Sequence, residues 1–166
     1  MSQSALSQTA EALLKAGRIA LFAHISPDGD TLGCLLALTH ALRQLGKEAI
    51  PFAADGVPQG LHWLPGAEMV QQNSERRDFD LSVVCDAGAL NRVGTSLVPL
   101  VESAPLVIDI DHHVVLGETF GEIQLLDSKA AATAELIYAL LRELEARSQQ
   151  DRKSTRLNSS HLVISY

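Results

Sequence analysis

The chain has 166 residues, 46% of them apolar, which is enough for one domain with a core of its own. Its net charge of −7 argues against a broad basic surface that would hold duplex nucleic acid, whereas a small anionic substrate is compatible with bound metal ions. The sequence shows no signal-peptide pattern and no apolar run of membrane-spanning length, so we expect a cytoplasmic protein without a membrane partner.

The first half of the chain alternates between helical and strand-like patterns. Apolar residues recur at helical spacing before Gly17, and short apolar runs follow it. The turn-forming sequence PDGD separates the first of these runs from a long apolar helix. In chain order, the predicted elements are a helix over residues 4–16, a strand over 18–23, a helix over 31–45, a strand over 48–53 and a Gly/Pro-rich connection over 55–66.

The second half continues the alternation. Its predicted elements are a strand over residues 79–85, a short helix over 95–103, a strand over 106–110, a further strand over 120–126 and a strong helix over 130–147. Continuously apolar strands are typical of a sheet that is covered on both faces. The pattern therefore predicts an α/β fold with a Rossmann-like, largely parallel sheet and helices on both faces. Cys34 and Cys85 lie in apolar runs and are expected to be reduced core residues.

The last sixteen residues differ in style from the rest. Residues 151–161 read DRKSTRLNSSH, which matches the translation of a widely used sequencing adapter, and the five residues after them fit the same origin. A native polar tail is the alternative. We expect residues 1–150 to form a domain that is incomplete at its C-terminal end, residues 151–166 to be a non-native tail, and the native chain to continue past Gln150.

Acidic residues and histidines follow three of the predicted strands. They are His24, Asp28 and Asp30 after the first strand, Asp86 after the third, and Asp111, His112 and His113 after the fourth. Each alone has a structural explanation, since an aspartate at a strand end commonly caps a helix or forms a turn. Because ligand sites in open parallel sheets form outside the carboxyl ends of the strands, the combination predicts one shared metal site.

Charge explains why metal ions are expected. Asp28, Asp30, Asp86 and Asp111 on one edge would repel one another without a counter-ion. A mixed histidine and carboxylate set suits manganese, with magnesium, iron or zinc as alternatives. Two divalent ions about 4 Å apart can hold phosphoryl oxygens and lower the pKa of a water towards neutrality. The residues therefore predict two-metal hydrolysis of a phosphate ester.

The same motifs carry a family resemblance. HISPDGD, which runs from His24 to Asp30, VVCDAG around Asp86, and the Asp-His-His triplet that begins at Asp111 resemble, in this order and spacing, the motifs of the DHH superfamily of phosphoesterases. The sequence AAATAE at residues 130–135 is most similar to the bacterial branch that degrades very short RNAs and dephosphorylates 3'-phosphoadenosine 5'-phosphate.

The resemblance implies a set of metal ligands. His24 and Asp28 would bind one ion, Asp30 and His112 would bind the other, and Asp86 would bridge both. The ions are expected to be Mn²⁺ first and Mg²⁺ second.

The resemblance also implies catalytic roles. Besides Asp86, His113 would contact the substrate phosphate, and Asp111 would orient the histidine pair. Arg92, in the loop after Asp86, either contacts phosphate or is a surface residue. Family members carry a fourth motif with a further metal-binding aspartate, and the context of Asp127 resembles a helix cap more than that motif.

Several functions are compatible with these motifs. The favoured one is hydrolysis of short oligoribonucleotides, of 3'-phosphoadenosine 5'-phosphate or of both, and a homodimer is possible. Within the superfamily, the alternatives are a cyclic-dinucleotide phosphodiesterase, a RecJ-like exonuclease, and a pyrophosphatase or polyphosphatase. A catalytically incomplete nucleotide-binding module is an alternative of another class. The family's fourth motif and its C-terminal substrate-binding domain are expected beyond Gln150, so we expect little activity from these 166 residues alone.

Overall fold

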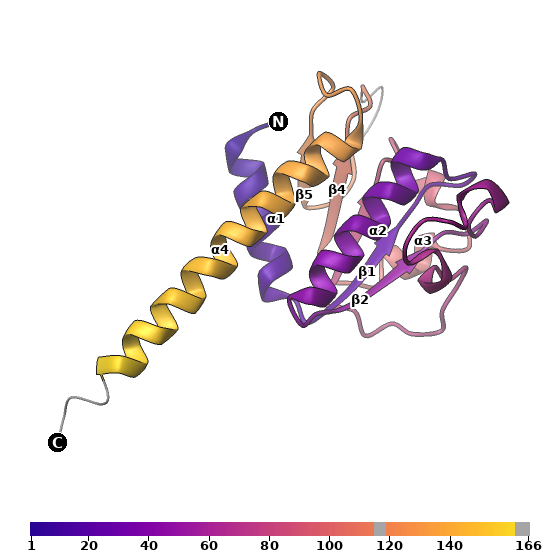
Figure 1. The fold of residues 1–166 in the computed structure, drawn as a ribbon. Coiled ribbons are helices and arrows are strands. Elements are labelled where there is room, and N and C mark those ends of the chain that lie inside the picture. The colour runs from indigo at the N-terminus through magenta and orange to yellow at the C-terminus, as the bar shows by residue number, and fades with distance from the viewer. Residues whose placement is uncertain (115–118, 162–166) are drawn as a thin grey trace.

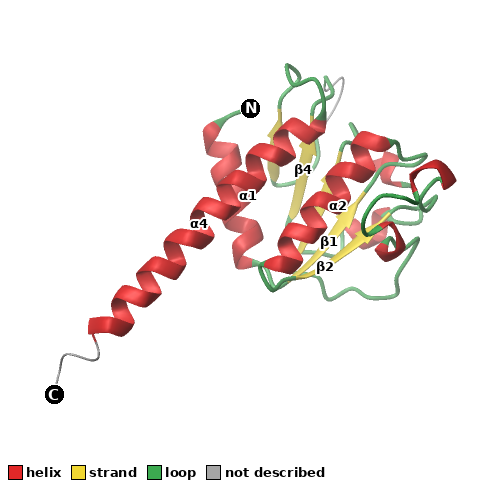
Figure 2. Ribbon diagram, in the orientation of Figure 1, coloured by secondary structure: helices red, strands yellow, loops and turns green. Residues whose placement is uncertain are grey.

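The computed structural model describes residues 1–114 and 119–161, with side chains described as far as residue 151 (Figures 1 and 2). Its strands are β1 Arg18–Phe22, β2 Glu48–Phe52, β3 Leu81–Cys85, β4 Val107–Asp111 and β5 Ile123–Leu126. Its α-helices are α1 Gln3–Lys15, α2 Gly29–Gln44, α3 Val98–Val101 and α4 Thr133–His161, and its short 3-10 helices are η1 Gln59–Leu61, η2 Ala67–Met69 and η3 Leu90–Val93.

The five strands form one sheet in the order β2-β1-β3-β4-β5, and every pair in it is parallel. The predicted α/β architecture with a parallel sheet is therefore confirmed. The chain adds β2 on one side of β1 and then returns to add β3 on the other. This reversal leaves the ends of β1 and β3 next to each other, which is where open α/β sheets bind their ligands.

The two faces of the sheet are covered unequally. α1, α2 and α4 pack on one face against inward residues such as Leu21 and Val83, and Figure 1 shows these three long helices side by side. On the other face, Phe22 and Val84 pack with Leu100 of the four-residue α3. Helices thus cover both faces as predicted, although the second face is covered mainly by short elements.

Caps decide where the helices start. α2 begins at Gly29, two residues before the predicted start, because the Asp28 side chain accepts the Thr31 N–H. α4 begins at Thr133, three residues later than predicted. It contains no glycine or proline, and it continues to His161, past the predicted end and beyond the sheet (Figure 1).

The cysteines and the helices agree with other expectations. Cys34 and Cys85 are free and buried, and burial raises the pKa of both thiols. Within residues 1–114 and 119–161, no helix combines the length and the apolar composition that a membrane span requires. Of the tail predicted over residues 151–166, residues 162–166 lie outside the described part.

Candidate metal centre

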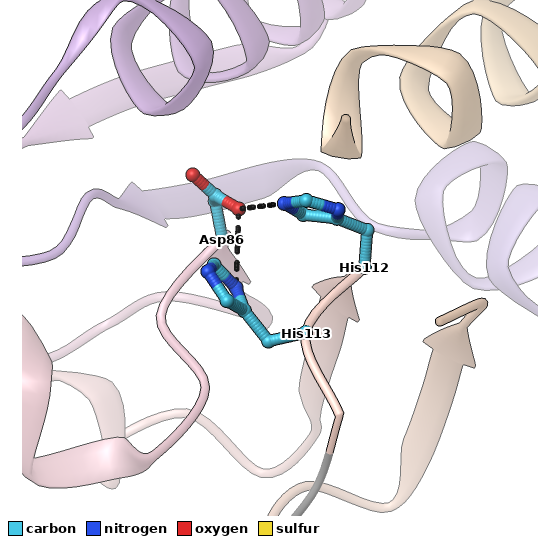
Figure 3. A group of neighbouring side chains, drawn as sticks. All are labelled: Asp86, His112 and His113. Atoms are coloured by element: carbon cyan, nitrogen blue, oxygen red, sulfur yellow. Dashed lines mark ion pairs between the residues drawn. The ribbon is translucent and has the colours of Figure 1, made fainter. Parts of the chain in front are cut away.

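Residues that follow β1, β3 and β4 meet at the carboxyl edge of the sheet. They form two groups that share one carboxylate, His24 with Asp28 and Asp86, and Asp86 with His112 and His113. In each group, one potential ligand atom per residue lies within 4.8 Å of the others. Figure 3 shows the second group, with both imidazoles turned towards Asp86.

Asp86 is the centre of the arrangement. It directly follows β3 and is 2% exposed. Its Oδ2 lies 3.9 Å from His24 Nε2, whereas its Oδ1 lies 3.7 Å from His112 Nε2 and 3.5 Å from His113 Nδ1. The two oxygens of this carboxylate therefore face different histidines: Oδ2 faces His24, and Oδ1 faces His112 and His113.

Backbone carbonyls set the orientation of two of these rings. His24 Nδ1 lies 2.6 Å from the Ile25 carbonyl oxygen, and His112 Nδ1 lies 3.2 Å from that of Ala130. A carbonyl only accepts, so each Nδ1 must carry the proton in these bonds. In the neutral form of either ring, the lone pair is on Nε2, the atom nearer Asp86, and a metal-binding histidine usually donates its other ring N–H in this way.

His113 is held differently. The Oδ1 of Asp111 accepts both the backbone N–H and the Nδ1–H of His113, at 2.8 and 2.7 Å, and its Oδ2 accepts the Gly88 N–H. The His113 side chain is 44% exposed, so its remaining nitrogen is available to an incoming ligand. The structure thus places Asp111 against His113, whereas the Ala130 carbonyl contacts His112.

Of the two aspartates in the PDGD turn, one belongs to a candidate ligand group and the other caps a helix. Asp28 belongs to the His24 group, and the Thr31 N–H that it accepts holds its pKa below the ordinary value, so it is ionised at neutral pH. Asp30 is in neither group. Its Oδ2 and Oδ1 accept the N–H groups of Thr133 and Ala134, at 2.8 and 3.0 Å, so it caps α4.

Two further candidates lie apart from the groups. Arg92 is exposed on η3, and among the described side chains its guanidinium has no carboxylate partner. Its backbone carbonyl accepts the Ile25 N–H at 2.6 Å, which ties η3 to the segment after β1. Asp127 pairs with the N-terminal ammonium group and accepts the Lys129 N–H, and its carboxylate belongs to neither group.

Sequence reasoning missed three buried polar residues, two at this edge and one inside β4. The hydroxyl of Thr31 lies 2.8 Å from Asp86 Oδ2, and that of Thr133 lies 2.7 Å from Asp86 Oδ1. Asp109, inside β4, is 3% exposed, and burial together with the charge of Asp111 raises its pKa to about 7. An acid within the apolar run LVIDI was the only sequence signal for Asp109.

Comparison with known proteins places the chain in a family. The model for the N-terminal domain of the DHH family matches residues 18–164, a range that extends past Gln150 into the predicted tail. The bifunctional oligoribonuclease and PAP phosphatase NrnA of Thermus thermophilus is 37% identical over 125 residues, which are 75% of this chain and 36% of that protein.

Solved structures agree on the fold. An exopolyphosphatase-related protein from Bacteroides fragilis has a TM-score of 0.78 at 26% identity, over 86% of this chain and 44% of that one. Exonuclease RecJ, in a structure with bound manganese, has a TM-score of 0.59 at 22% identity, over 89% of this chain and 39% of RecJ, and shows likeness of fold alone. The chain spans less than half the length of these relatives. As its motifs predicted, the chain belongs to the DHH family.

Proposed function

We propose that this chain is the metal-binding catalytic half of a phosphoesterase that hydrolyses short oligoribonucleotides, 3'-phosphoadenosine 5'-phosphate or both. The geometry of Asp86 carries the proposal. One buried carboxylate presents one oxygen to His24 and the other to the His112 and His113 pair, which is how a bridging ligand serves two neighbouring cations. The kinship with NrnA, whose name gives both activities, supports this choice of substrates.

The donor set fits two divalent ions. His24, Asp28 and Asp86 would hold one, and Asp86 with His112 would hold the other. Asp30 is proposed as a further ligand of the second ion, because a carboxylate oxygen that accepts one N–H keeps another lone pair. Imidazole nitrogen mixed with carboxylate oxygen favours Mn²⁺, with Mg²⁺ as the alternative.

The neighbouring residues would act on the substrate. With its Nδ1–H donated to Asp111, His113 in its imidazolium form would donate the N–H of its remaining nitrogen to a phosphoryl oxygen. Arg92, exposed on η3, would contact a second phosphate or the far side of the same one. The bound cations would offset phosphoryl charge and lower the pKa of a water. Without them, the carboxylates would repel an anionic substrate.

The division of the chain is part of the same proposal. We propose that residues 1–150 are native, that residues 151–166 derive from a sequencing adapter, and that a substrate-binding domain follows in the complete gene. An independent read of the source DNA across the codon for Gln150 tests this directly. A frame that continues into a Gly-rich domain supports it, whereas a read that reproduces DRKSTRLNSSH contradicts it.

The activity test uses the protein expressed from the complete gene, with Mn²⁺ and separate substrates: RNA of two to five nucleotides, 3'-phosphoadenosine 5'-phosphate and a cyclic dinucleotide. We expect turnover of the first two, and a loss of roughly 10³-fold in Asp86→Asn, because several kcal/mol of transition-state stabilisation depend on the bridge. Asp127→Asn is the matched control, since this carboxylate lies outside both groups.

The other outcomes select among alternatives. Wild-type turnover in Asp86→Asn would contradict the two-metal site. Hydrolysis of the cyclic dinucleotide alone would make the protein a cyclic-dinucleotide phosphodiesterase. Nucleotide binding without any hydrolysis would favour the catalytically incomplete binding module.

A further inference from the structure

The start of α4 and the residues just before it contact predicted ligands from three other segments of the chain. The Ala130 carbonyl faces His112 Nδ1 at 3.2 Å, the Thr133 and Ala134 N–H groups bind Asp30 at 2.8 and 3.0 Å, and the Thr133 hydroxyl lies 2.7 Å from Asp86 Oδ1. Of these contacts, the one made by the Thr133 hydroxyl reaches the shared carboxylate. It therefore links α4 to the carboxylate that both groups share.

The Thr133 hydroxyl forms a different kind of hydrogen bond from that of Thr39, another buried threonine in a helix. Thr39, also 0% exposed, donates to the carbonyl of Leu35 one turn earlier, which is a local bond within its helix. Thr133 is 0% exposed as well, but its hydroxyl reaches a carboxylate 47 positions away in the sequence. A carboxylate only accepts, so the Thr133 hydroxyl must donate.

Thr31 makes the same contact from the opposite side. Its hydroxyl lies 2.8 Å from Asp86 Oδ2 and 3.1 Å from Asp28 Oδ1. A hydroxyl has one hydrogen to donate, and the shorter distance assigns it to Asp86. The Asp86 carboxylate therefore receives a hydroxyl on each oxygen, one from α2 and one from α4. Each oxygen has two lone pairs, so one can accept the hydroxyl while the other faces the imidazole beside it.

We infer that Thr133 is a positioning residue, whose hydroxyl, together with that of Thr31, fixes the plane of the Asp86 carboxylate so that its two oxygens reach two separate cations. This inference rests on the proposed function, because it needs cations at the two groups. The hydroxyls act through Asp86 and need not contact the ions themselves. Without one of them, the carboxylate can rotate about its χ2 torsion, which is intrinsically broad.

The experiment is a titration of the 166-residue chain with Mn²⁺, followed by the electron paramagnetic resonance signal of the free ion. Loss of a hydrogen-bond partner behind a metal ligand typically weakens binding about 10- to 100-fold. We expect this loss in Thr133→Val, which keeps the shape of the side chain but removes the hydroxyl. Thr133→Ser keeps the hydroxyl and should bind Mn²⁺ like the wild type.

Two further variants make the test specific. Thr39→Val removes a buried helical hydroxyl that makes only a local bond, and it should leave Mn²⁺ affinity unchanged. Thr31→Val removes the hydroxyl on the other oxygen of Asp86 and should also weaken binding. Circular dichroism of each metal-free variant checks folding. If Thr133→Val does not fold, the comparison of Thr31→Val with the wild type decides the test.

The outcomes separate the inference from the proposed function. If the wild type binds Mn²⁺ and the folded Thr133→Val variant binds it equally well, the metal site stands and the positioning role is wrong. Equal weakening in Thr133→Ser and Thr133→Val also overturns that role, because the hydroxyl would then not matter. If the wild type binds no Mn²⁺, the proposed metal site fails and the inference fails with it.

Discussion

Asp86 lies at the centre of the candidate metal site and has an unfavourable backbone conformation. Its φ of 61° lies in the left-handed region, which costs a residue other than glycine about 1–3 kcal/mol. Asn and Asp tolerate this region better than most residues. The chain keeps a buried, hydrogen-bonded aspartate in this conformation where β3 meets the site, which is the pattern expected of a residue retained for chemistry rather than for folding.

A second acid, Asp109, should make stability depend on pH. Its folded pKa of about 7 is raised above the unfolded value, so its contribution to stability is fully present below about pH 4 and is lost as the pH rises through 7. We expect Asp109→Asn to lose this fall in the free energy of unfolding between pH 4 and 7. Urea unfolding of both proteins at several pH values measures the difference. Parallel pH profiles would show that Asp109 does not titrate in this way.

At the residue scale, the sequence predicted the acids and histidines at strand ends because turn composition and strand length mark those positions. It did not predict the roles of Thr31 and Thr133, since their partner lies 55 and 47 positions away. Only the packing of α2 and α4 against the end of β3 brings these hydroxyls to Asp86. A single threonine in a helical pattern carries no such signal.

At the element scale, α2 and α4 are joined by a cap in which Asp30, in the first turn of α2, accepts the first N–H groups of α4. This contact crosses 103 and 104 positions of sequence, so the cap belongs to the tertiary structure.

Removing that cap should loosen the start of α4. Asp30→Ala takes away both acceptors, and we expect it to cost about 1–2 kcal/mol in the free energy of unfolding. Asp30→Asn keeps one carbonyl acceptor and should cost less. Hydrogen exchange localises the effect, since the amides of Thr133 and Ala134 should lose protection before those of α1. Unchanged protection at both amides would contradict the capping role.

Periodicity located the helices and strands well, but their ends only approximately. The predicted helix over 95–103 shortened to Val98–Val101, where Pro99 lies in the first turn and the chain must soon enter β4. The start of α2 moved because Asp28 caps it. Apolar spacing reports which face is buried, whereas the ends depend on individual hydrogen bonds.

At the scale of the whole molecule, alternating helices and strands predicted a parallel sheet but could not give the order of its strands. That order brings the ends of β1 and β3 together, and with them His24 and Asp86. Clustered carboxylates should also make the folded chain dependent on cations, since any ligand that binds the native state alone stabilises it.

We therefore expect Mn²⁺ to raise the thermal midpoint of the 166-residue chain. At a free concentration 100 times Kd, binding at one site adds about 2.7 kcal/mol, which for a domain of this size is a shift of roughly 5–10 °C. Asp86→Asn should abolish most of the shift, whereas Asp127→Asn should keep it. Differential scanning calorimetry with and without Mn²⁺ measures both. An equal shift in Asp86→Asn would locate the bound ion elsewhere.

In the proposed two-metal site, one carboxylate shared by two groups would prevent the two cations from loading independently. An ion on the His24 side would neutralise Asp86 and fix its plane, and both effects would change the affinity of the His112 side. Thermodynamic linkage makes this influence reciprocal, with one coupling free energy describing both directions. The occupancy of either position would then report on the other, and the metal content of a purified sample would be a cooperative quantity, not the sum of two separate equilibria.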